Sequence, residues 1–473
     1  MSLSIGSYAN QLVIAYFGSY KKIHRLTFRI IIMKTYAISN RIQIISMLIS
    51  LIGFAAFATS YKSNPDLLTL NEFREIRGEV VDSKTKEPLV NATLNLVESN
   101  IVTVTNTDGH FTLKIPKSVI SDKITVSFLG YKLKTFDIKE LNDAFNTIIL
   151  EESTIDLQEI NLTTITNAKT LIEEVFKNKA DNYFNDPVVM TGFYRETIKR
   201  RNRNVSLSEA VVNIYKSPYT SGKRDDIKLY KARKSTDYKR LDTIALKLQG
   251  GPCNSLFLDI VKYPEYIFAN EKIDDYVFTI GRTTEINNAL IYVIKFRQKD
   301  DVNTPLYKGE LFIEPHKKVL VSAVFSLNIT DEKEAGYLFV KKKPKNAEVY
   351  PTEIIYRVDY KSKNNKWYFS YGNAQLQFKI NWHKKLFNTV YTLSSEMDVT
   401  DWNKNMMEER INRKDFIKPT IILSDAIRGF SGPDFWGEHN IIEPDKNIES
   451  AIKKIQRQIR KSNSNRPLNY SIP

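Results

Sequence analysis

The sequence predicts a mainly β protein: a small seven-stranded sandwich, then a larger, curved antiparallel sheet with a few helices. Tyrosine and phenylalanine contribute 25 residues each, and such residues suit half-buried strands. Short apolar runs alternate with polar residues along most of the chain, which is the period of a strand. A length of 473 residues exceeds the usual size of one core, so two folded units are expected.

The N-terminal region has the pattern of a secretory signal. Lys34 and Arg41 precede an apolar run over 42–58 that ends in small residues. This order predicts a signal peptide at 33–58, cleaved after Ala58. The run of about 17 residues is at the short limit for spanning a bilayer, so an uncleaved anchor is the less favoured alternative.

Residues 1–32 do not fit in front of a signal peptide. We interpret them as a mis-assigned extension, with translation beginning at Met33, and 59–73 as a linker. The apolar run is followed by no cysteine, which argues against a bacterial lipid anchor.

Charge and cysteine content exclude several kinds of partner and cofactor. The net charge is +15, but the first 58 residues carry six Lys or Arg and no acid, which leaves +9 on the other 415 residues. Those cations are mixed with acids, so no nucleic-acid partner is expected. Cys253 is the single cysteine; it excludes an intrachain disulfide and is expected to be a buried hydrophobe. No cofactor is predicted.

Residues 74–151 are expected to form a small antiparallel sandwich. Short alternating apolar runs are separated by Pro88 and polar turns, as in strands joined by tight connections. Asp108-Gly109 favours the positive φ of a hairpin turn before the run at 111–115. Roughly seven strands in about 75 residues are typical of a sandwich.

The order of these turn residues resembles the carboxypeptidase regulatory-like domain. The matching positions are Gly78, Val80, Asp82, Pro88-Leu89, Asn91-Ala92, Thr107-Asp108-Gly109, Phe111 and Gly130-Tyr131. The resemblance implies a transthyretin-like sandwich that often follows the signal sequence in envelope proteins of double-membraned bacteria. It implies an accessory module without peptidase activity. Backbone geometry and turns explain the same residues equally well.

The second unit begins after a polar, threonine-rich linker at 152–168. A helix follows, capped by Thr166 or Asn167, and its apolar face consists of Leu171, Ile172, Val175, Phe176 and Ala180. The sheet domain is expected over 169–445, with one buried and one wet face. Its clearest strands are 276–280, 289–296, 306–313, 319–327, 354–360, 374–380 and 390–397. The pattern is weakly similar to the half-barrel of periplasmic lipoprotein carriers.

Residues 446–473 are expected to form an amphipathic basic helix and a tail. Such a helix can lie on an anionic membrane, but docking on its own domain is favoured.

No catalytic or metal site is predicted. None of the five histidines begins a zinc-peptidase motif, and the nearest serine elbow, Gly429-Phe430-Ser431-Gly432, has the wrong spacing. Two distant carboxylates of a glycosidase could not be paired from sequence alone.

The segment 430–444 is the one candidate ligand site. It concentrates Asp434, Phe435, Trp436 and His439 among glycines, which could line a pocket for a sugar. The alternative is a buried loop that closes the sheet, and it is favoured.

Three segments together with the sandwich resemble a family of uncharacterised bacterial envelope proteins with a carboxypeptidase-like regulatory domain. They are 192–196, 208–210 and 434–444. We expect a non-enzymatic exported binding or assembly protein in the periplasm or on the periplasmic face of the outer membrane. Its partner would be an envelope protein or a glycan or lipid ligand. The alternatives are a hydrolase of envelope glycan or peptide, and a periplasmic carrier of a lipophilic ligand.

Overall fold

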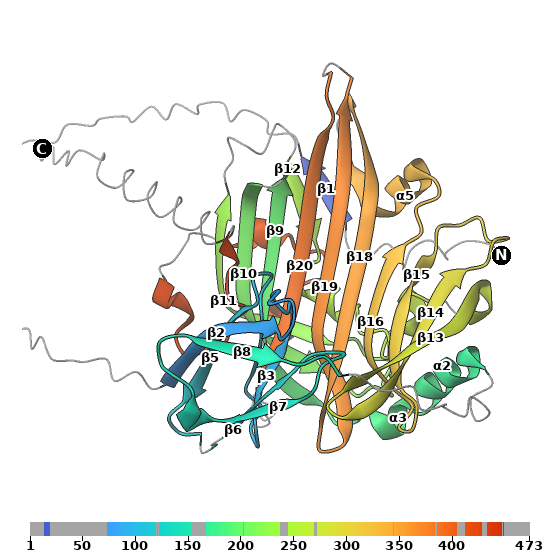
Figure 1. Ribbon diagram of the computed structural model, residues 1–473. Coiled ribbons are helices and arrows are strands. Elements are labelled where there is room, and N and C mark those ends of the chain that lie inside the picture. The colour runs from blue at the N-terminus through green and yellow to red at the C-terminus, as the bar shows by residue number, and fades with distance from the viewer. Residues whose placement is uncertain are drawn as a thin grey trace, which may run out of the picture. The chain divides into compact units, whose positions relative to one another are not determined.

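The computed structural model describes 14–18, 73–119, 121, 123–153, 167–201, 203–236, 245–268, 272–343, 345–383, 386–403, 412–427, 433–446 and 448 (Figure 1). The predicted signal peptide and its cleavage site at Ala58 lie outside these residues. Most of the extension 1–32, the two linkers and the C-terminal helix also lie outside them. Within the described ranges, no helix has the length and apolar character needed to cross a bilayer.

The first folded part is a sandwich of seven strands, as predicted. Its two sheets have the orders β5-β2-β8 and β4-β3-β6-β7. β2 pairs with β8 in parallel, which corrects the antiparallel prediction. Alternation is the same in both kinds of pairing, so the pattern could not distinguish them. The elements are β2 Phe73–Asp82, β3 Thr93–Leu96, β4 Val102–Val104, β5 His110–Pro116, β6 Lys123–Ser127, β7 Lys134–Asp137, η3 Ile138–Glu140 and β8 Asn146–Leu150.

Two glycines of the sandwich occupy positions that no other residue suits. Gly109 has φ of 73° and closes the predicted turn before β5. Gly78 lies in β2 between Phe111 and Asn146, its register partners on either side. A Cβ at Gly78 would lie 2.9 Å from the Phe111 ring and would collide with the Asn146 carbonyl.

The second part is a ten-stranded antiparallel sheet whose edges, β11 and β13, do not pair with each other. The strand order is β11-β10-β9-β20-β19-β18-β16-β15-β14-β13. All seven predicted strands lie in it. Its strands are β9 Val188–Arg200, β10 Arg203–Lys216, β11 Asp226–Thr236, β13 Tyr276–Ile286, β14 Ala289–Gln298, β15 Tyr307–Glu314, β16 Val319–Leu327, β18 Ala347–Lys363, β19 Lys366–Trp382 and β20 Thr389–Asn403.

The two faces of this sheet differ in chemistry. Along β18, Ile354, Tyr356 and Val358 are fully buried on one face, which we call the apolar face. The segment 252–268 packs there and adds its own buried side chains, including Cys253, to one large core. The intervening residues Arg357 and Asp359 lie on the opposite, polar face.

Helices and short strands complete the described chain. The predicted helix is α2, and Asn167 caps it by accepting a hydrogen bond from the Lys169 amide at 3.0 Å. Leu171, Ile172 and Val175 are buried, as predicted. The remaining elements are β1 Ile14–Gly18, α2 Ala168–Lys177, α3 Lys179–Asn182, β12 Ala245–Gln249, α4 Pro252–Leu256, η5 Pro264–Tyr266, η6 Lys272–Asp275, α5 Glu332–Phe339, β17 Val340–Lys342, η8 Arg413–Asp415, α6 Leu423–Ala426 and η9 Pro433–Trp436.

Gly78→Ala should destabilise the protein by about 1–3 kcal/mol, because the added methyl group has no room between β5 and β8. Gly222→Ala is the matched control, since a Cβ there meets nothing within 4 Å. Chemical denaturation of both variants measures the difference. Equal stability of the two variants would show that β2 does not pack as described.

Candidate functional site

Four charged side chains form a row across neighbouring strands of the polar face. The register places Glu209 between Arg233 and Arg195, and Arg195 between Glu209 and Glu396. Side chains at directly opposed positions lie about 4.5–5.5 Å apart at Cβ, so opposite charges there attract. We call Arg233, Glu209, Arg195 and Glu396 the charge ladder.

Glu209 is the centre of the charge ladder. It is fully buried, and each of its oxygens accepts a hydrogen bond: from Arg195 Nε at 2.8 Å and from Arg233 Nε at 2.6 Å. Burial by itself would raise the pKa of Glu209, but the two guanidinium groups outweigh burial and hold the pKa below its usual value. Glu209 is therefore ionised in the folded protein.

Arg195 also holds the C-terminal segment 433–446, which we call the strap. Its Nη2 donates to the Ile442 carbonyl at 2.7 Å. The Arg233 guanidinium carbon lies 4.9 Å from the centre of the Trp436 ring, a cation–π contact. Both arginines of the ladder therefore position the strap on the polar face.

The strap binds the sandwich on its other side. The Asn440 side chain accepts from the Lys114 amide at 2.7 Å and donates to the Lys114 carbonyl at 3.0 Å, in the manner of a strand partner for β5. Thr112 donates to the Glu443 carboxylate at 2.7 Å. A small apolar cluster joins sandwich, sheet and strap, and it consists of Val104, Phe193, Val211, Tyr371, Trp436, Ile441 and Ile442.

The residues that the sequence singles out as a ligand site lie in the strap. Trp436 is 2% exposed, Phe435 lies 4.8 Å from it between ring centres, and Trp436 Nε1 has no described acceptor. His439 packs edge-on against Tyr230 at 5.0 Å, and burial lowers its pKa. The Asp434 side chain lies outside the described set. Ligand binding by these residues stays a prediction.

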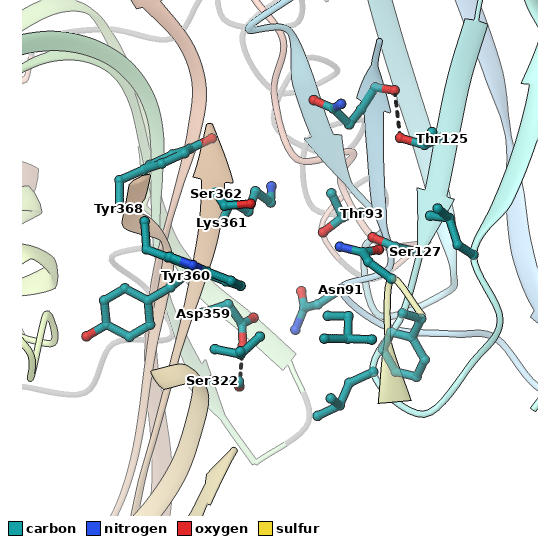
Figure 2. A pocket seen from close by; sticks show the side chains of 18 of the residues that line it. Asn91, Thr93, Thr125, Ser127, Ser322, Asp359, Tyr360, Lys361, Ser362 and Tyr368 are labelled. Atoms are coloured by element: carbon teal, nitrogen blue, oxygen red, sulfur yellow. Dashed lines mark hydrogen bonds between the residues drawn. The ribbon is translucent and has the colours of Figure 1, made fainter. Parts of the chain in front are cut away.

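A cavity of about 260 Å³ lies elsewhere on the polar face, between the sheet and the sandwich. Figure 2 shows Asn91, Thr93 and Ser127 of the sandwich facing Asp359 and Lys361 of β18. The rest of its polar lining includes Asn95, Thr125, Asn287, Ser322, Arg357 and Ser362, and Trp367 and Tyr368 add aromatic surface.

Lys361 is a cation of this cavity whose ammonium has no described hydrogen bond. On the same strand, Arg357 Nε donates a hydrogen bond to Asp359 Oδ2 at 2.9 Å. Ser322 donates to the other carboxylate oxygen of Asp359 at 2.5 Å. The Lys361 ammonium is buried and donates to no described protein group. Burial lowers the pKa of Lys361, and the Asp398 and Asp359 carboxyl groups oppose that effect.

Asp398 is a second buried group without a described hydrogen bond. It lies on β20, is 0% exposed, and neither of its oxygens accepts a hydrogen bond from a described group. The register places Tyr371 between Asp398 and the cavity residue Asp359. Burial raises the pKa of Asp398 to about 7, although Lys361 pulls it down. Burial therefore favours the protonated form of Asp398 in the folded protein.

A second cavity of about 260 Å³ lies beside the charge ladder. Arg195, Lys199 and Glu396 of the sheet line it, together with Asp445 of the strap. Asn91, whose φ is 63°, lines both cavities. The sandwich therefore covers two polar hollows on one face of the sheet.

Sequence reasoning missed Lys361 and Asp398. Arg357, Asp359 and Lys361 alternate with buried residues along β18 and look like the solvated face of a strand. This stretch of the strand becomes an interior only because the sandwich, more than 200 residues earlier in the chain, covers it. The signal that could have found them is the density of charge at alternate positions of so long a strand.

The comparison with family models identifies the sandwich. The CarboxypepD_reg-like domain matches residues 76–162, so this part of the chain is a domain of that family, as its turn residues predict. No curated protein sequence matches the chain.

Several solved structures resemble about half of the chain. A domain from Vibrio parahaemolyticus named for outer membrane lipoprotein sorting is 14% identical, covers 53% of this chain and 97% of its own, and has a TM-score of 0.23. A LolA superfamily protein from Nitrosomonas europaea is 11% identical, covers 54% and 100%, and scores 0.17. The MucA/MucB complex of Pseudomonas aeruginosa is 8% identical, covers 48% and 93%, and scores 0.17. Scores this low carry no weight for function.

Asp398→Asn should remove a pH dependence of stability. The folded protein keeps a proton on Asp398 that the unfolded chain releases above its ordinary pKa of 3.8, so wild-type stability falls between pH 3.8 and about 7. Over that interval the free energy of unfolding of the variant should rise relative to that of wild type, by a few kcal/mol at most. This difference should level off above pH 7. Urea denaturation across this pH range measures it.

Asp301→Asn, at an exposed position, is the control and should follow the wild-type curve. Parallel curves for Asp398→Asn and wild type would mean that Asp398 is ionised throughout the interval.

Proposed function

We propose that the protein is a non-enzymatic, exported binding protein of the bacterial cell envelope, and that the cavity at Lys361 is its ligand site. The observation that carries this proposal is the Lys361 ammonium, which is buried at the cavity and has no described acceptor. A buried cation of this kind is costly without a partner, and a bound anion would supply one.

The ligand that fits this lining is small, polar and anionic. Asparagine, threonine and serine side chains on both walls can donate and accept hydrogen bonds, as hydroxyl and amide groups of a ligand require. Trp367, which is half-buried, adds aromatic surface that a sugar ring could contact. The volume is below the roughly 300–1,000 Å³ of pockets for drug-sized ligands, which favours one acidic sugar or one amino-acid residue of a longer chain.

Export is part of the same proposal. It rests on the predicted signal peptide at 33–58, and places the chain in the periplasm or on the periplasmic face of the outer membrane. There, acidic glycans and peptides of the envelope are within reach.

The lipophilic carrier is less well supported by the side chains. The apolar face of the sheet, where an acyl chain would lie, is filled by the chain's own segment 252–268. Leu256, Phe257 and Ile260 of that segment are each less than 5% exposed. The cavity beside the charge ladder is lined mainly by polar residues, whereas the cavity at Lys361 combines polar residues with Phe128, Leu129, Leu133, Ile286 and Val321.

Lys361→Met should weaken binding of an acidic ligand by about 10- to 100-fold, the loss of one hydrogen bond to a charged group. Titration calorimetry with muramic acid derivatives, glucuronic acid and D-alanyl-D-alanine, each beside a neutral analogue, provides the measurement. Lys308→Met, at an exposed position of β15, is the control.

Neutral analogues that bind as tightly as the acids, or equal affinities of the Lys361 and Lys308 variants, would rule out this site. The absence of binding by every acid in the panel would count against the ligand class.

A further inference from the structure

The turn between β19 and β20 presents two adjacent apolar side chains to solvent. Leu386 is 97% exposed and Phe387 is 79% exposed. β19 is 17 residues long and β20 is 15, whereas β15 and β16 of the same sheet have 8 and 9 residues. Figure 1 shows the long strands extending past these shorter ones. A single exposed hydrophobe is ordinary, but an adjacent pair at a projecting tip is a candidate contact surface.

The chain segments around this tip are strongly basic. The ranges 197–208, 335–347 and 379–395 together contain eleven Lys or Arg and no Asp or Glu, in a chain whose whole net charge is +15. Five of these cations are exposed in the described part of the chain: Arg201, Arg203, Lys341, Lys343 and Lys345. Of the carboxylates that flank these ranges, Glu196 and Glu209 are buried within the sheet, Glu348 and Glu396 are half-buried, and Glu334 is exposed.

Backbone contacts hold the three basic segments at one end of the sheet. The Arg201 amide, in the turn between β9 and β10, donates to the Val390 carbonyl at 2.9 Å. The His383 amide donates to the Asn346 carbonyl at 3.2 Å, which joins the turn after β19 to the loop before β18. Leu386 and Phe387 therefore lie at the same end as the cations.

We propose that this end of the sheet, where the five exposed cations surround Leu386 and Phe387, docks on an anionic phospholipid bilayer. Leu386 and Phe387 would enter the boundary between headgroups and acyl chains, and the surrounding lysines and arginines would lie among the phosphates. An apolar tip within a basic rim is the combination that binds anionic membrane surfaces. This proposal does not depend on the ligand of the cavity.

A bilayer explains the apolar pair, which a polyanion such as nucleic acid would leave in water. Binding to nucleic acid depends chiefly on cations that neutralise phosphates. Leu386 in particular offers neither a hydrogen bond nor a ring on which a base could stack.

A fluorophore at the tip tests insertion directly. The full-length chain with Cys253→Ala and Phe387→Cys is labelled with an environment-sensitive dye and mixed with vesicles of phosphatidylcholine, with or without phosphatidylglycerol. We expect a blue shift and a several-fold rise in emission only with the vesicles that contain phosphatidylglycerol. The same dye at Phe145→Cys, a sandwich position that is 50% exposed, should not respond. This local readout is independent of any other membrane-binding segment.

Charge reversal tests the basic rim. The triple variant Arg201→Glu, Arg203→Glu and Lys345→Glu should lower the affinity for anionic vesicles, measured with the dye at position 387, by at least about 100-fold. Each cation near the surface contributes roughly fivefold to that affinity. The control reverses three exposed lysines of the sandwich, Lys86, Lys117 and Lys123, and changes the net charge equally.

If the emission of the dye at position 387 does not change when anionic vesicles are added, the proposal is wrong. Equal effects of the two triple variants would overturn it too. Binding of duplex DNA that depends on the same three residues, with no change at position 387, would assign the rim to nucleic acid instead.

Discussion

A single buried carboxylate, Glu209, organises the polar face of this protein. It is ionised between two buried arginines, and removal of one partner from such a group typically costs about 3–5 kcal/mol. The three strands that carry these residues are thereby held in one register. Arg195 then uses a remaining donor to bind the strap at Ile442, and the strap binds β5 of the sandwich.

As a result of these contacts, the two faces of the sheet have different roles. The apolar face is filled by the protein's own core, and it supplies stability. The polar face is buried only because the sandwich and the strap cover it. Most buried polar groups of proteins are hydrogen-bonded, but Lys361 and Asp398 have no described hydrogen-bond partner under this cover. The accessory sandwich therefore creates the proposed site and supplies one of its walls.

Local patterns predicted the elements well, and they failed where distant residues meet. The expected strand at 319–327 coincides with β16, and Asn167 caps α2 as predicted, because both features depend on neighbouring residues. The charge ladder depends on the pairing of Arg195 with Glu396, which lie 201 residues apart in the chain, and periodicity contains no information on such a pairing. For the same reason, Lys361 looked solvated in the sequence. For Trp436 the sequence favoured a buried loop over a ligand pocket, without deciding between them.

The most direct test of this account is the free energy of unfolding of Glu209→Gln, compared with that of Glu310→Gln. Glu310 is a half-exposed partner of Arg282 at 3.6 Å, and such a pair contributes at most about 1 kcal/mol. The account predicts that Glu209→Gln lowers the free energy of unfolding by about 3–5 kcal/mol, because two buried guanidinium groups lose their anion. Equal losses in the two variants would contradict the claim that Glu209 organises the structure.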